Sequence, residues 1–260
     1  MKLPHYKAVS FNDIIRLGGH SKPWIISTEG ETYVVKLYKT IDLEARNKMA
    51  AEVIGNLLAK EFDLQVPDAA IIEFDDSFRM SLKEEEEEIL SLLDERCKFG
   101  SVYLTESYLY SVQIDYSNIE ENIAPDTLYA FDYLICNRDR TLLKPNLLVT
   151  NNKIVLIDHE MALEINDQTL SNLQQSIWDK RYTHHLFYDR LKNSSEETKE
   201  HYFEEFAFYL QEIRWNKFNE IFAQLQDLGF DPQAKKVKEY FKCVQQNTNK
   251  FINILKDSIK

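Results

Sequence analysis

Three polar residues in one segment of the chain could together carry out chemistry on a phosphate. Asp139 and Asn146 flank a polar loop, and Asp158 follows the four apolar residues 154–157. These side chains offer carboxylate and amide oxygens, which suit magnesium, an ion that binds one or two carboxylates together with phosphate oxygens of a substrate. The segment therefore predicts a site for a divalent metal and a phosphorylated ligand.

A metal-bound phosphate also needs a positively charged side chain to compensate its charge, and Lys36 is placed to provide one. Lys36 ends the run Tyr33-Val34-Val35-Lys36, in which strand alternation puts Val34 and Lys36 on one face. Glu52, on the helical segment that follows, is a candidate ion-pair partner for this lysine. A lone strand lysine is more often simply solvated, so Lys36 gains weight only from the rest of the pattern.

A glycine-containing turn precedes the first of these strands. It consists of Gly18, Gly19, His20 and Ser21. Paired glycines permit close approach of the backbone to a phosphate, and the amides of a tight turn form an anion-binding concavity. The pattern matches neither of the standard glycine-rich phosphate motifs, so a purely structural turn is an equally good interpretation of these residues alone.

The elements that must position these groups follow from apolar periodicity. A hairpin is expected over residues 24–38, a helix over 47–62, strands over 69–74 and 101–109, and a short helix over 89–97 after the acidic run 84–88. A buried helix over 127–136 and a second hairpin over 146–157 follow, and beyond Asp167 the apolar residues fall on helical stripes. The polar candidates thus lie on a strand, a helix, a loop and the end of a hairpin.

Composition limits the class of protein. The 260 residues are 44% hydrophobic and 28% charged, as in a folded globular chain, and the net charge of −12 argues against nucleic acid as a partner. Cys97, Cys136 and Cys243 are widely spaced, which favours neither a disulfide framework nor a zinc site. No apolar stretch is long enough for a signal peptide or a membrane span, so a cytoplasmic protein without membrane contact is expected.

The order of these motifs along the chain is the order that phosphoryl transfer by the protein-kinase architecture requires. On this pattern the chain resembles the HipA-like kinase family, specifically its compact single-chain bacterial branch, within the superfamily of protein and phosphatidylinositol kinases. The resemblance covers about residues 10–165 well and the helical tail loosely. It is carried by Gly18-Gly19-His20-Ser21, Tyr33-Val34-Val35-Lys36, Ala51-Glu52, Phe99-Gly100-Ser101, Asn137-Arg138-Asp139-Arg140-Thr141, Asn146-Leu147-Leu148 and Leu156-Ile157-Asp158-His159.

The resemblance implies a role for each candidate residue. Asp139 would be the catalytic aspartate that accepts the proton of the attacking hydroxyl, and Asn146 and Asp158 would hold Mg²⁺ against the phosphates of ATP. Lys36 would bind the α- and β-phosphates, steadied by Glu52. The turn of Gly18, Gly19, His20 and Ser21 would cover the phosphates. Arg140 would compensate charge near the site.

Two departures from the family pattern affect these assignments. Asn146 lies seven residues after Asp139, whereas the common kinase spacing is about five. Lys144 stands at the nearer place and cannot ligate magnesium, so the metal is assigned to Asn146. Glu160, two residues after Asp158, is either an added ligand or, more often for such an acid, a salt-bridged group.

The fold that the resemblance implies is an α+β, two-lobed protein-kinase-like fold. Residues 1–105 would form a small antiparallel β lobe with one helix that binds the nucleotide, and residues 106–260 a mostly helical lobe with the catalytic loop and the metal-binding hairpin. The expected function is an ATP- and magnesium-dependent serine/threonine protein kinase, with a protein substrate and an antitoxin-like regulator as partners. Two alternatives stay open: a small-molecule or lipid-head-group kinase, and an ATP-binding pseudokinase or regulatory module.

Overall fold

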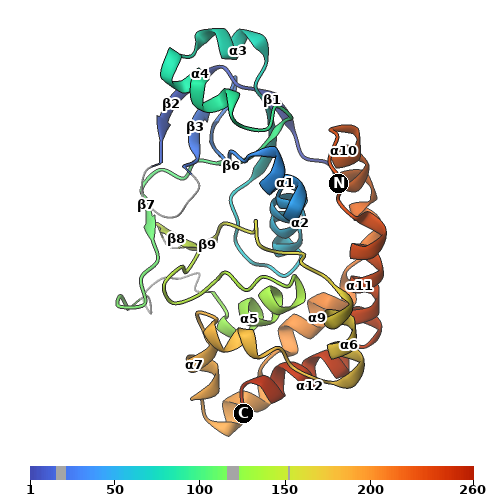
Figure 1. Ribbon diagram of the computed structural model, residues 1–260. Helices are drawn as coiled ribbons and strands as arrows, with labels where there is room; N and C mark the ends of the chain where they lie inside the picture. Colours follow the sequence, from blue (N-terminus) through green and yellow to red (C-terminus); the bar gives the residue numbers. More distant parts are fainter. Residues whose placement is uncertain (16–21, 116–122, 152) are drawn as a thin grey trace. The chain divides into compact units, whose positions relative to one another are not determined.

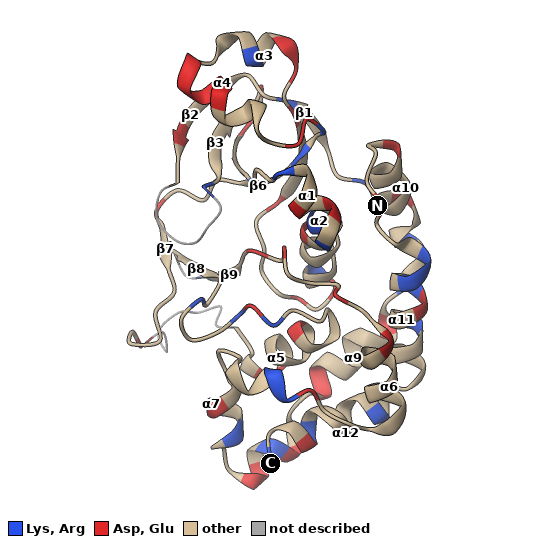
Figure 2. Ribbon diagram, in the orientation of Figure 1, with Lys and Arg blue, Asp and Glu red and all other residues tan. Residues whose placement is uncertain are grey.

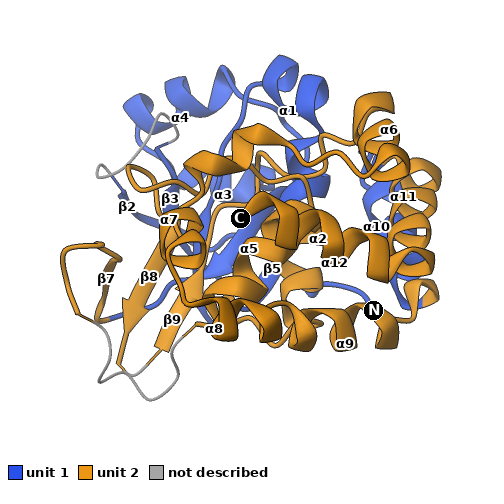
Figure 3. Cartoon of the chain, turned by 90° about the horizontal axis from the view of Figure 1, so that it is seen from below, with its two compact units in different colours: residues 1–53, 67–105, 217–232 blue, residues 54–66, 106–216, 233–260 orange. Residues whose placement is uncertain are grey.

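The computed structural model describes every residue except 16–21, 116–122 and 152. The chain divides into two compact units, coloured separately in Figure 3. Unit 1 contains residues 1–53, 67–105 and 217–232, and unit 2 contains residues 54–66, 106–216 and 233–260. Helix α2 (Lys48–Lys60) begins in unit 1 and ends in unit 2.

Unit 1 is organised around a mixed sheet, in which the described residues form six strands in the order β1-β5-β6-β4-β3-β2 (Figure 1). Neighbouring strands are antiparallel except for β1 and β5, which run parallel. The predicted hairpin over residues 24–38 is confirmed as β3 and β4. The strands are β1 (His5–Lys7), β2 (Ser10–Ile14), β3 (Trp24–Ser27), β4 (Thr32–Val35), β5 (Ala69–Glu73) and β6 (Lys98–Val102).

Alternating burial explains why β3 and β4 form one layer of the unit 1 core. Trp24 and Ile26 of β3 and Tyr33 and Val35 of β4 are all buried, whereas the residues between them are only partly so. Because side chains of a strand alternate between its two faces, these four residues point into the same core. Phe11 of β2 packs edge-on against Trp24, with the ring centres 4.9 Å apart.

Helices also belong to unit 1, and one of them corrects a boundary predicted from the sequence. The acidic run expected to precede a helix over 89–97 is itself the start of α4 (Glu84–Ser91), as the red segment in Figure 2 shows. Acidic groups in a first turn are favourable because the amino end of a helix carries partial positive charge. The other helices here are α1 (Thr40–Arg46), α3 (Asp76–Ser81) and α10 (Asn219–Asp227).

Unit 2 contains a smaller antiparallel sheet, β7-β8-β9, formed by β7 (Ser107–Leu109), β8 (Leu147–Thr150) and β9 (Lys153–Leu156). The predicted second hairpin is confirmed as β8 and β9. The strand predicted over 101–109 is wrong, because β6 and β7 are separate strands in different sheets. Glu106, in the gap between them, has a φ of 56°, a left-handed conformation that ends an extended run.

The helices of unit 2 gather around α5 (Pro125–Leu134), most of whose residues are buried. Phe62 packs against Phe131 of α5 and stacks on Phe206, with ring centres 5.6 and 4.8 Å away. A helix that is apolar on all sides needs such cover on all sides. The remaining helical elements are α6 (Asp167–Gln175), η1 (Lys180–His184), α7 (Tyr188–Lys192), α8 (Glu196–His201), α9 (Glu204–Glu212), α11 (Ala234–Gln246), α12 (Thr248–Ser258) and η2 (Trp215–Phe218), which ends in unit 1.

Among the residues that the structure describes, no helix has both the length and the apolar character needed to cross a membrane.

Candidate active site

The loop that carries Asp139 starts where helix α5 ends. The helix stops because Cys136 adopts a left-handed conformation, with a φ of 57°. The backbone N–H of Asn137 then donates to the carbonyl of Asp132, 2.8 Å away, which satisfies one of the open carbonyls at the helix end. The chain leaves α5 in a fixed direction, two residues before Asp139.

A buried polar network lies beneath this loop and is centred on Asp132 of α5. Its carboxylate accepts hydrogen bonds from Nε of Arg140 (2.6 Å) and Nδ2 of Asn137 (2.8 Å), and it contacts Nε2 of His185 at 3.1 Å. The side chains of Asp132 and Arg140 are both fully buried. Because each charge is out of water, each depends on the other for compensation.

The protonation states within this network follow from its contacts. Burial alone would raise the pKa of Asp132, but the charge of Arg140 and the hydrogen bond from His185 outweigh burial and lower the pKa to about 2. Burial lowers the pKa of His185 by more than Asp132 raises it, so the ring is neutral at pH 7. Its Nδ1 accepts from the N–H of Phe187, which leaves the ring proton on Nε2 to donate to Asp132.

Arg140 holds the backbone around the predicted metal ligands. Its Nη1 donates to the carbonyls of Pro145, Asn146 and Ile157 at 3.4, 2.5 and 3.5 Å. The N–H of Ile157 also donates to the carbonyl of Asn146, 3.1 Å away. The guanidinium of Arg140 is buried against Asp132, whose charge it compensates, and it fixes the main chain where Asn146 and Asp158 arise.

The three predicted oxygen donors of unit 2 lie together. Nδ2 of Asn146 donates to Oδ2 of Asp139, 3.3 Å away. Nζ of Lys144 lies 2.5 Å from Oδ2 of Asp139 and 3.1 Å from Oδ2 of Asp158. The two carboxylates therefore face one positively charged group, with the amide of Asn146 beside them.

Backbone conformation adds a reason for the residue types at two of these positions. Asn146 and Asp158 have φ values of 51° and 63°, in the left-handed region. Asn and Asp tolerate this region better than other residues with a Cβ, and branched side chains tolerate it worst. Strained conformations of this kind cluster at functional positions, where the surrounding structure holds them.

Lys144 has a larger role in the site than its sequence position indicated. Burial lowers its pKa, but the carboxylates of Asp158 and Asp139 outweigh that effect, so the pKa is raised. The side chain is charged at neutral pH. From the sequence alone Lys144 was only a residue unable to ligate magnesium, whereas the structure places its ammonium in contact with both acids.

Two neighbours of Asp158 complete this edge of the site. Carboxylate oxygens of Asp158 and Glu160 lie within 4.8 Å of each other, which places a further acid close to the predicted metal ligands. His159 is buried and meets the ring of Phe131 edge-on. A Cβ on Gly55 of α2 would lie 2.6 Å from Cβ of His159. Only glycine fits at position 55 without displacing the residue that follows Asp158.

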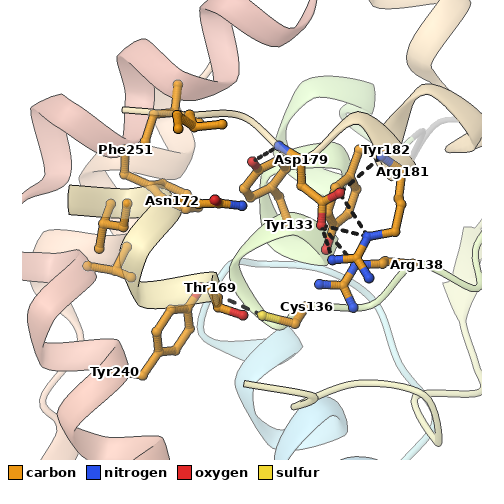
Figure 4. Close-up of a pocket in the computed structure, with 14 residues that line it drawn as sticks. Tyr133, Cys136, Arg138, Thr169, Asn172, Asp179, Arg181, Tyr182, Tyr240 and Phe251 are labelled. Atoms are coloured by element: carbon orange, nitrogen blue, oxygen red, sulfur yellow. Dashed lines mark hydrogen bonds and ion pairs between the residues drawn. The ribbon is translucent and has the colours of Figure 1, made fainter. Parts of the chain in front are cut away.

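Arg138, directly before Asp139, is anchored on another side of the loop. In Figure 4 the guanidinium groups of Arg138 and Arg181 converge on the carboxylate of Asp179, with the nearest nitrogens 3.1 and 2.7 Å from its oxygens. The hydroxyl of Tyr133 accepts from the N–H of Asp179 at 2.7 Å. The cavity beside this cluster has a volume of about 30 Å³, room for about one water molecule. This cluster serves to fix the loop.

The other predicted residues belong to unit 1 or lie outside the described residues. Nζ of Lys36 forms an ion pair with Oε1 of Glu52, and both side chains are largely or fully buried, at 13% and 1% exposure. The hydroxyl of Tyr38 donates to the same carboxylate oxygen, 3.4 Å away. The backbone N–H of Lys36 donates to the carbonyl of Phe99 (3.1 Å), which fixes the end of β4. Gly18, Gly19, His20 and Ser21 lie outside the described residues.

Sequence reasoning missed the buried support of the loop. Asp132 had a detectable signal, since an acid within an otherwise apolar helix must find a partner when it is buried. Its partner His185 is 53 residues away in sequence, and no local pattern links the two. For the position of Lys144 between two acids, the only indication in the sequence was the unusual spacing of Asp139 and Asn146.

Comparisons with known proteins give the same class of enzyme. The sequence profile of a family described as HipA-like kinase matches residues 15–249. The crystal structure of the Helicobacter pylori proinflammatory kinase CtkA is similar over 99% of this chain and 98% of that one, with 14% sequence identity and a TM-score of 0.52. At that identity the similarity shows a shared fold, and it confirms the predicted kinase-like α+β class.

A more distant similarity joins the chain to the choline kinase LicA from Streptococcus pneumoniae. It covers 96% of this chain and 94% of that one at 14% identity, with a TM-score of 0.31, too low to carry an inference. A search of curated protein sequences gave no match.

Proposed function

The chain belongs to the HipA-like kinase family and is therefore a phosphotransferase, and from this premise we propose that it transfers the γ-phosphoryl group of ATP to a serine or threonine hydroxyl of a protein. One observation carries the proposal: the carboxylates of Asp139 and Asp158 face a single cation, with the amide of Asn146 in contact with Asp139. Phosphoryl transfer needs positioned charge more than covalent chemistry, and this cluster can provide it.

Asp139 is the proposed catalytic base. In this role its carboxylate orients the acceptor hydroxyl and takes up its proton as the oxygen attacks the γ-phosphorus. Two features support the assignment: Asp139 is partly exposed, with 26% of its side chain accessible, and its backbone N–H donates to Oδ1 of Asn137, 3.2 Å away, which fixes the loop at this residue. Asn137 in turn is held by the buried Asp132.

Asn146 and Asp158 are the proposed ligands of Mg²⁺. The donor set fits this ion, because carboxylate and amide oxygens are its usual protein ligands and because the acids already face a cation, the ammonium of Lys144. When bound, Mg²⁺ would supply positive charge to the phosphate oxygens of ATP. The chain's own contribution is to hold the two side chains in place through the hydrogen bonds of Arg140 to the backbone.

Unit 1 supplies the proposed nucleotide-binding residues. Lys36 would bind the α- and β-phosphates, and its ion pair with the buried Glu52 would restrict the ammonium to one position. Gly18, Gly19, His20 and Ser21 would cover the phosphates with backbone amides. The assignment of a serine or threonine acceptor rests on the family alone.

Incubation with γ-³²P-labelled ATP tests the proposal. We expect wild-type protein to label serine or threonine residues in a bacterial protein extract, and Asp139→Asn to reduce the rate by about 10²–10⁴-fold, the usual contribution of a positioned base. Asp257→Asn, a change at an exposed acid of α12, is the matched control and should retain the wild-type rate.

Other outcomes distinguish the alternatives. Label that appears on an added metabolite or lipid head group and on no protein would identify a different acceptor class. ATP binding without turnover, equal in wild type and Asp139→Asn, would identify a nucleotide-binding regulatory protein and contradict the proposed activity.

A further inference from the structure

The position of Lys144 is unusual for a residue in a metal site. Its ammonium lies 2.5 Å from Asp139 and 3.1 Å from Asp158, so it contacts one oxygen of each carboxylate. Two acids that face the same small space repel each other, and the ammonium offsets this repulsion. It lies against Asp158, where a divalent ion bound to that carboxylate would also have to lie.

The backbone of Lys144 is fixed, whereas its side chain can move. The N–H of Thr141 donates to the carbonyl of Lys144 (3.0 Å), and the N–H of Lys144 donates to the carbonyl of Thr141 (3.2 Å), which closes a tight turn. The ring of Pro145, the next residue, fixes its own φ, and its carbonyl accepts from Nη1 of Arg140. The side chain of Lys144 is 41% exposed, and its four-carbon stem allows the ammonium to leave the acids without movement of the turn.

We propose that Lys144 is an exchangeable counter-cation that couples metal binding to nucleotide binding at this site. Without nucleotide, its ammonium, held by Asp139 and Asp158, competes with a divalent ion for the Asp158 carboxylate and weakens metal binding. With nucleotide present, the phosphate oxygens offer the displaced ammonium a new partner, so the metal enters at less cost. The inference rests on the proposed metal ligands and adds a positioning role for a lysine that does not bind the metal.

The proposal makes a thermodynamic prediction because coupling between two ligands is reciprocal. Removal of the ammonium should raise the affinity for metal in the absence of nucleotide and reduce the factor by which nucleotide improves that affinity. Ion pairs that are partly exposed are individually weak. Two of them acting on one ammonium lead us to expect a change in metal affinity of about tenfold.

Mn²⁺ is a suitable probe, because the free ion is counted directly by electron paramagnetic resonance. Titrations of nucleotide-free protein would compare wild type with Lys144→Met and with Lys144→Gln. Lys153→Met is the matched control, since it removes one positive charge from an exposed position at the far end of the same hairpin. We expect about tenfold tighter Mn²⁺ binding in both Lys144 variants and less than a twofold change in the control. Circular dichroism would verify that each variant is folded.

A second titration, with a non-hydrolysable ATP analogue present, measures the coupling. The analogue should tighten Mn²⁺ binding by a larger factor in wild type than in Lys144→Met. Equal factors, or Mn²⁺ binding to nucleotide-free Lys144→Met that is no tighter than in wild type, would overturn the proposal.

Asp158→Asn separates failure of this inference from failure of the proposed site. If Asp158→Asn weakens Mn²⁺ binding while Lys144→Met does not strengthen it, the metal ligand stands and the role of Lys144 is wrong. If Asp158→Asn leaves Mn²⁺ affinity unchanged in the Lys144→Met background, the metal assignment fails, and the role of Lys144 fails with it.

Discussion

Replacement of Asp132 by asparagine is a stringent test of the buried network. The change keeps the shape of the side chain and removes its charge, which leaves the guanidinium of Arg140 buried without its counter-charge. Loss of one partner from a buried ion pair typically costs about 3–5 kcal/mol of unfolding free energy. We expect a loss of this size at pH 7, together with a lower rate of phosphoryl transfer, because Asp132 also holds Asn137 and, through Arg140, the backbone of Asn146.

The loss of unfolding free energy in Asp132→Asn should become smaller at acidic pH, and the pKa of Asp132 sets the pH range of this change. The pKa falls from 3.8 in the unfolded chain to about 2 in the folded protein, and each pKa unit corresponds to about 1.4 kcal/mol, so the ionised group contributes on the order of 2 kcal/mol. Because the folded pKa is the lower one, this contribution is complete above pH 3.8 and is lost as the pH falls through about 2. About half of it should be gone by pH 3.

Urea denaturation followed by circular dichroism at several pH values between 7 and 2.5 measures both effects. The quantity of interest is the difference in unfolding free energy between wild type and Asp132→Asn at each pH, since the protonation of all other acids largely cancels in that difference. Asp257→Asn, at an exposed position, should stay within about 0.5 kcal/mol of wild type throughout. A difference for Asp132→Asn below 1 kcal/mol at pH 7, or one that does not narrow in acid, would show that Asp132 and Arg140 are not coupled as described.

Two further substitutions test the supports of the site. Lys36→Met removes the charge partner of the buried Glu52 and should lower the unfolding free energy by about 3 kcal/mol, at the low end of the usual range because the Tyr38 hydroxyl remains. It should also raise the KM for ATP in a phosphotransfer assay. Unchanged stability and an unchanged KM would contradict this role of Lys36. Gly55→Ala places a methyl group 2.6 Å from Cβ of His159 and should lower the unfolding free energy by about 1–3 kcal/mol and also lower kcat. Gly30→Ala, at a position with no neighbour within 4 Å, should change neither quantity. Equal melting temperatures for the two alanine variants would disprove the close contact.

The sequence predicts the elements of this chain where apolar periodicity is strong. Both hairpins and helix α2 lie where β-branched runs and helical stripes placed them. Strands β1 and β2 were missed because their residues are mainly exposed and polar, and only Phe11 and Ile14 of β2 pack against the core. The strand expected over 101–109 is divided, because β6 ends at Val102 and the left-handed Glu106 stands directly before β7.

The candidate site shows the same division between local and distant information. Asp139, Asn146 and Asp158 could be proposed together because they flank one loop and one hairpin, and turn geometry brings such neighbours close. The residues that fix them could not be predicted, since Asp132 and His185 come into contact only after the chain has folded. The conformation of Lys144 depends on a closed turn and on charge compensation, and neither leaves a periodic pattern in the sequence.

The hydrogen bonds from Arg140 to three main-chain carbonyls also have an evolutionary consequence. A carbonyl is present at every residue, whatever side chain follows it, so the anchoring of positions 145, 146 and 157 does not depend on which amino acids stand there. Random mutagenesis under selection for retained folding should therefore find position 157 more permissive than positions 132 and 140, which should change only as a pair, whereas position 146 stays restricted by its left-handed backbone. Anchoring through main-chain carbonyls thus lets an anchored side chain vary while the buried pair of Asp132 and Arg140 stays constant.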